Sequence, residues 1–135
     1  MSDFKVTYLG DLSTEVIHLE SGSKILTDAP IDNQGLGRTF SPTDLVASSL
    51  ASCMLTIIAI AAKTHSINIK SMASSIKKIM SKTTPRRISK IDIEITVSGA
   101  LNDKDKIVIE RSAKNCPVHH SLNHDININL DFRYK

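Results

Sequence analysis

A run of eighteen residues without a charge, from Leu45 to Ala62, constrains the fold of this chain more than any other feature. Apolar residues recur along it at spacings of three and four, the pattern of a helix with one apolar face. Ser41 and Pro42 fit the N-cap and the first position of such a helix, and Asp44 stands at capping-box spacing from Ser41. The run predicts one long buried helix that begins at residue 42 and ends near Lys63.

The length of this run also permits a membrane span. Four hydroxyl side chains and several alanines interrupt it, and no Trp or Tyr stands at either end, where membrane interfaces favour them. We therefore predict a helix that is buried in the core or at a subunit interface, and no membrane partner.

Shorter segments on both sides of the run alternate between apolar and polar residues, which is typical of strands with one buried face. Strands are predicted over residues 4–9, 15–20, 24–28, 67–80, 88–98 and 125–135, and a second helix over 102–115, which Pro117 stops. The strands cluster rather than alternate with helices. The order predicts a single α+β domain over residues 1–135, with mostly antiparallel sheets around a long central helix.

Charge and composition exclude some classes of partner. The net charge is +3, and the basic residues gather between Lys77 and Lys90. No aromatic side chains interleave with them to stack on bases, so no nucleic-acid partner is predicted. The first ten residues hold no apolar signal core, which favours a cytoplasmic protein whose cysteines are reactive or inert rather than paired for structure.

The chain has two cysteines, and the first, Cys53, stands near the centre of the uncharged run. A free cysteine is often a small buried hydrophobe, and burial raises the pKa of a thiol and so lowers its reactivity. A reactive Cys53 therefore needs a nearby cation. Arg38, in the loop LGRTF, is the one arginine that precedes it, although such a residue is equally typical of a solvated surface.

The second cysteine, Cys116, lies in NCPVHHSLNH together with His119, His120 and His124. These residue types are zinc ligands, so a metal-binding module that uses Cys116 and His119 is one alternative. The segment lacks the second pair of ligands that a structural zinc site requires. We predict no metal and no cofactor.

Two segments together, SPTDLVASSLASC and NCPVHHSL, resemble the OsmC/Ohr family in order and spacing over essentially the whole chain. The resemblance implies an OsmC-like fold, an intertwined homodimer and a cysteine-based peroxidase for organic hydroperoxides. It implies that Cys53 is the peroxidatic thiol and Cys116 the resolving thiol, which form a disulfide. It further implies that Arg38 is the loop arginine that activates Cys53, that Asp44 is the carboxylate that holds it, and that the reductant is a lipoylated protein or a small dithiol.

The helix start departs from the family pattern, because many members have Glu there, sometimes at the position of Thr43, and Asp44 is one methylene shorter than Glu. Asp44 precedes Cys53 by nine residues, so on one helix the two lie roughly 13 Å apart and on opposite faces. If Asp44 and Arg38 both serve Cys53, either Arg38 reaches back through its loop or the partner subunit supplies the acid. Alternatively, Asp44 acts only as a helix cap. The alternative function is a non-catalytic OsmC-like homodimer that binds a small apolar ligand at the subunit interface.

Overall fold

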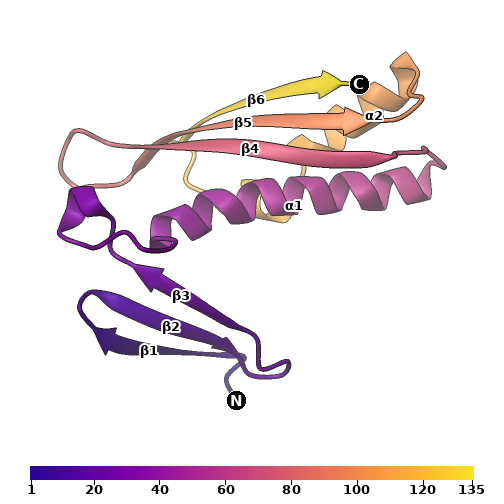
Figure 1. Ribbon diagram of the computed structural model, residues 1–135. Coiled ribbons are helices and arrows are strands. Elements are labelled where there is room, and N and C mark those ends of the chain that lie inside the picture. Colours follow the sequence, from indigo (N-terminus) through magenta and orange to yellow (C-terminus); the bar gives the residue numbers. More distant parts are fainter. The chain divides into compact units, whose positions relative to one another are not determined.

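The computed structural model describes residues 1–135, which form two compact units, residues 1–46 and residues 47–135. The N-terminal unit holds a three-stranded antiparallel sheet in the order β1-β2-β3 (Figure 1). Its strands are β1 (Phe4–Gly10), β2 (Ser13–His18) and β3 (Lys24–Asp28), and a 3-10 helix, η1 (Ile31–Asn33), follows them. The three predicted strands are confirmed, although β2 begins two residues earlier than expected.

The long helix α1 spans Pro42–Thr64, which confirms the prediction from the uncharged run. Its first turn contains the expected capping box. The Asp44 amide donates to Ser41 Oγ at 3.1 Å, and the Ser41 amide donates to Asp44 Oδ2 at 2.9 Å. Two of the amide groups that a helix start leaves without partners are thereby satisfied.

The C-terminal unit contains a second sheet in the order β4-β5-β6, made of β4 (Ser71–Met80), β5 (Ile88–Ser98) and β6 (Asn127–Tyr134). Strands β4 and β5 pair antiparallel, but β5 and β6 pair parallel. A parallel partner requires a crossover, and here α2 (Asp103–Lys114) and α3 (Pro117–Ser121) supply it. Pairing is thus mostly antiparallel, as predicted, with one parallel exception.

The core of this unit lies between one face of the sheet and α1, which runs along that face in Figure 1. Leu50, Met54 and Ile58 of α1 are fully buried, at the helical spacing of three and four that the sequence shows. They join the inward-facing residues of β5 and α2, which are Ile91, Ile93, Ile95, Val97, Ile109 and Ala113. By length and composition α1 would pass for a membrane span, but this burial makes it a core helix.

Pro117 does more than was predicted from the sequence. It follows the end of α2, as expected, but it also occupies the first position of α3, a five-residue helix that was not predicted. A proline fits there because the first amide of a helix has no intrahelical partner. Asn102 caps α2 in a capping box with Asp105.

Candidate dithiol site

The two cysteines lie in the C-terminal unit, and both are free thiols. Cys53 is half-buried on α1, one residue before the fully buried Met54. Cys116 is fully buried in the short connection between α2 and α3. Both belong to the same hydrophobic cluster, so one thiol retains access to solvent while the other has none.

The motif around Cys116 has a local structural reason. Cys116 is the N-cap of α3, with extended backbone angles, and its Sγ accepts a hydrogen bond from the His119 amide at 3.3 Å. This is the bond that a Ser or Asp oxygen usually accepts at a helix start. Cys116, Pro117 and His119 therefore form the N-terminal cap of α3, and this cap fixes the direction of the Cys116 sulfur atom.

The pKa of the Cys116 thiol is raised above its ordinary value, chiefly by burial. The hydrogen bond from the His119 amide lowers this pKa, and the neighbouring side chain of Cys53 raises it further. Cys53 packs against the buried cluster that contains Cys116, so the fold brings the two thiols into the same part of the core. Cys116 is held as a neutral thiol, next to the more accessible Cys53.

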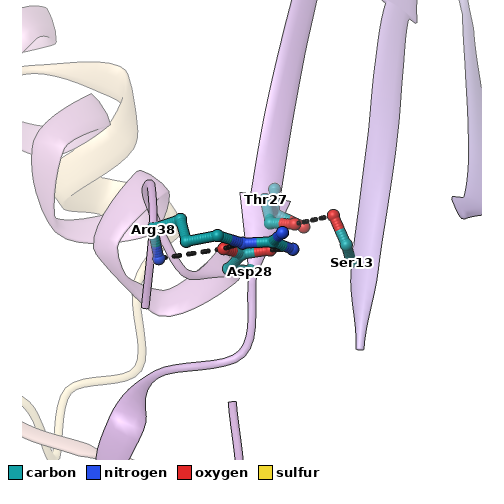
Figure 2. Close-up of polar contacts among 4 residues, drawn as sticks. All are labelled: Ser13, Thr27, Asp28 and Arg38. Atoms are coloured by element: carbon teal, nitrogen blue, oxygen red, sulfur yellow. Dashed lines mark hydrogen bonds and ion pairs between the residues drawn. The ribbon is translucent and has the colours of Figure 1, made fainter. Parts of the chain in front are cut away.

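Arg38 lies in the N-terminal unit and forms a bidentate ion pair with Asp28, at the end of β3 (Figure 2). Its Nε and Nη2 donate to the two carboxylate oxygens at 2.8 and 3.0 Å, and its backbone amide donates to Oδ2 at 2.9 Å. The Asp28 side chain is only 3% exposed, whereas that of Arg38 is 59% exposed. The carboxylate thus anchors a guanidinium that keeps much of its surface free.

Asp28 is held ionised by these contacts. The hydrogen bond from the Arg38 guanidinium lowers the pKa of Asp28 to about 2, against the opposing effect of burial. Ser13 adds to the lowering, and its hydroxyl donates to the Thr27 carbonyl at 2.8 Å, which ties β2 to the end of β3 (Figure 2). Asp28, the last residue of β3, thus anchors the loop that carries Arg38.

Asp28 is the residue that the sequence analysis missed. The family resemblance implies Asp44 as the carboxylate that holds Arg38, with a helix cap as its other reading, and in this chain Asp44 takes part in the capping box with Ser41. The available signal was an aspartate at the last position of a strand, immediately before the loop with the arginine. The ion pair between Asp28 and Arg38 depends on how the loop of residues 29–40 folds back, and hydrophobic periodicity gives no information on the path of a loop.

The histidines near Cys116 have separate environments. The His120 ring lies 2.6 Å from Asn115 Oδ1 through its Nε2. The His119 ring packs edge-on against that of His120, and its Nδ1 is buried without a hydrogen-bond partner. The structure contains no group of three or more side chains that could hold a metal ion.

Comparison with known proteins places this site in a family context. The profile of the family described as OsmC-like protein matches residues 35–131. A crystal structure from Psychrobacter arcticus, which carries the provisional name osmotic stress induced and detoxification response protein, is 47% identical in sequence. The alignment covers 98% of this chain and 96% of that one, with a TM-score of 0.92.

More distant structures share the fold. An organic hydroperoxide resistance protein OsmC from Legionella pneumophila is 14% identical, with a TM-score of 0.79 over 96% of this chain and 94% of its own. An organic hydroperoxide resistance protein from Elizabethkingia anophelis is also 14% identical, with a TM-score of 0.78 over 100% of this chain and 98% of its own. A search of curated protein sequences finds no match.

Proposed function

The chain belongs to the OsmC family, and on that premise we propose that it is a thiol peroxidase that reduces organic hydroperoxides with Cys53 and Cys116. The observation that carries this proposal is the unequal pair of neighbouring thiols. Cys53 is half-buried, whereas Cys116 is fully buried beside it with a raised pKa. Such a pair suits a mechanism in which one thiol meets the substrate and the other acts only afterwards.

The chemistry has two steps. The Cys53 thiolate attacks the distal oxygen of the hydroperoxide, the O–O bond breaks, and an alcohol leaves once its oxygen has taken a proton. Cys53 is now a sulfenic acid, oxidised by two electrons. The Cys116 sulfur then attacks the Cys53 sulfur, water leaves, and a disulfide forms. A dithiol reductant, either a small molecule or a lipoylated protein, restores both thiols by exchange.

The setting of Cys53 favours organic substrates. Its neighbours along α1 are the buried Leu50 and Met54, and the half-buried Leu55 and Ile57 pack against the same core. An apolar surface stabilises the alkyl part of a hydroperoxide, which hydrogen peroxide lacks. The names of the Legionella and Elizabethkingia proteins agree with this substrate class.

We assign the activating cation to Arg38. A guanidinium stays protonated at all working pH values, and it stabilises both a thiolate and a departing alkoxide. Asp28 aims this guanidinium through its bidentate pair, while the exposed part of Arg38 remains available. Asp44 contributes by capping α1, the helix that carries Cys53.

The partner in this proposal is a second copy of the chain. Phe4, Val6 and Tyr8 share one face of β1, and they are 59%, 62% and 65% exposed. On α1, Ile60 is 56% exposed. A three-stranded sheet with so much apolar surface requires cover, and a symmetric homodimer supplies it without another protein. We place this dimer in the cytoplasm, where thiols stay reduced between turnovers.

The test is peroxide consumption with a dithiol as reductant. We expect the wild-type protein to consume cumene hydroperoxide faster than hydrogen peroxide. Cys53→Ser should abolish consumption. Cys116→Ser, assayed without the dithiol, should consume one equivalent of hydroperoxide and hold Cys53 as a sulfenic acid, whereas wild type forms the disulfide. Equal and slow rates for wild type and Cys53→Ser would refute the peroxidase and leave the ligand-binding alternative.

A further inference from the structure

His119 Nδ1 is a buried ring nitrogen that has no hydrogen-bond partner. Leaving such an atom without a partner costs desolvation free energy, so most buried polar groups in proteins are paired. Ser74 Oγ is the one other side-chain atom of this kind, and it lies on β4. His119 differs from it because a titratable nitrogen is left bare three residues after the resolving cysteine.

The position of His119 connects the buried thiol with a cavity. Its backbone amide donates to Cys116 Sγ at 3.3 Å, so the first turn of α3 fixes both residues together. The residue also lines a cavity of about 610 Å³ with Met54, which follows Cys53 on α1, and with Lys114 and β6. A proton held by this ring therefore has a route to solvent.

The attack of Cys116 on oxidised Cys53 needs a base next to the Cys116 thiol. Cys116 must lose its proton to become a good nucleophile, because the thiolate is the reactive form. Burial works against that loss by raising the thiol pKa. Among the ring nitrogens nearby, His120 Nε2 is already engaged with Asn115, whereas His119 Nδ1 is unengaged. In the neutral ring with its proton on Nε2, Nδ1 is an acceptor.

We propose that His119 is the general base of disulfide formation. The proton of the Cys116 thiol passes to Nδ1 while the Cys116 sulfur attacks the Cys53 sulfenic sulfur. The S–O bond breaks, and the departing hydroxide takes the proton from Nδ1 as water, so the ring ends neutral. This inference rests on the proposed peroxidase function, in which Cys53 is oxidised first. Nδ1 has no hydrogen-bond partner in the resting structure, so its contact with the thiol forms in the reacting state, where catalytic hydrogen bonds often tighten.

The experiment isolates the attack by Cys116 from peroxide chemistry. A thionitrobenzoate disulfide reagent is mixed with the reduced protein, and the more accessible Cys53 forms a mixed disulfide with release of a coloured thiolate. Attack by Cys116 then releases a second coloured thiolate and one proton. The rate of this second release is measured against pH for wild type, His119→Asn and His119→Gln. His124→Asn, at an exposed histidine outside α3, is the matched control, and Cys116→Ser shows the first release alone.

We expect His119→Asn and His119→Gln to slow the second release about 100-fold near neutral pH. The loss should shrink as pH rises past the ordinary thiol range, because solvent hydroxide then replaces the base. His124→Asn should match wild type. A second release that is unchanged in both His119 variants, or is slowed equally at every pH, would overturn the assignment, since the latter indicates only a misplaced Cys116. If wild type does not react with peroxide but forms the Cys53–Cys116 disulfide quickly with the reagent, the proposed peroxidase function is wrong. The assignment of His119 as general base is then still supported.

Discussion

Cys116 accepts the hydrogen bond that begins α3, from the amide of His119 to its Sγ at 3.3 Å. The second cysteine is therefore both a structural cap and the proposed resolving thiol. The cap holds the sulfur still in the buried space beside Cys53, where free rotation would reduce the frequency of attack. The cap of α3 and the proposed resolving step thus both depend on Cys116.

Cys116→Ala should destabilise the fold by at least about 1 kcal/mol, because it removes a helix cap and leaves the His119 amide without its partner. Cys116→Ser retains an oxygen acceptor and should lose less. Denaturant unfolding of reduced protein measures both. Equal stability of Cys116→Ala and wild type would show that the hydrogen bond to sulfur contributes nothing.

The ion pair between Asp28 and Arg38 should appear in the pH dependence of stability. The pKa of folded Asp28 lies at about 2, below the ordinary 3.8. The ionised carboxylate therefore stabilises the fold at pH values above 3.8, and this contribution is lost as pH falls through about 2. The stability difference between wild type and Asp28→Asn should be constant above pH about 5 and vanish at the acid end. Parallel curves down to the lowest pH would contradict the pair.

The core between α1 and the second sheet should respond strongly to truncation. Leu50 is fully buried, so Leu50→Ala should cost about 2–5 kcal/mol through lost burial and a residual cavity. Ile107→Ala, on the exposed face of α2, is the matched control and should change stability by less than about 0.5 kcal/mol. Similar losses at the two sites would contradict the described packing.

The proposed homodimer predicts a defect that can be separated from folding. Tyr8→Lys places a charge on the exposed apolar face of β1 and should raise the dimer dissociation constant at least about tenfold. Ser75→Lys, at an exposed position of β4, is the control. Sedimentation measurements over a dilution series give both constants. A Tyr8→Lys protein that remains as dimeric as wild type would exclude this face from the interface.

Much of the fold was predictable because long elements carry their own signals. Helix α1 and strand β5 were located from periodicity, and the capping box at Ser41 and Asp44 marked the helix start. The short helix α3 was missed, since five residues are too few for a periodic pattern and its cap is a cysteine. The parallel pairing of β6 was missed because the direction of a strand depends on the crossover before it.

The site was predictable only where residue type is diagnostic. Two cysteines in two motifs identified Cys53 and Cys116, and the fold brings them together. The partner of Arg38 was not predictable, because Asp28 meets it through the fold of a loop rather than through a fixed spacing. The buried Nδ1 of His119, which has no hydrogen-bond partner, was also not predictable, because the burial of a single ring atom depends on packing alone.

The most direct test of the central claim is a thiol count with intact mass on fully reduced protein, before and after about one equivalent of cumene hydroperoxide. We expect a fast loss of both thiols and a decrease of about 2 Da, the mass of two hydrogens, with a slower reaction when hydrogen peroxide is used. Thiols that survive for minutes with unchanged mass would contradict it, and Cys53 would then be a core residue without redox function.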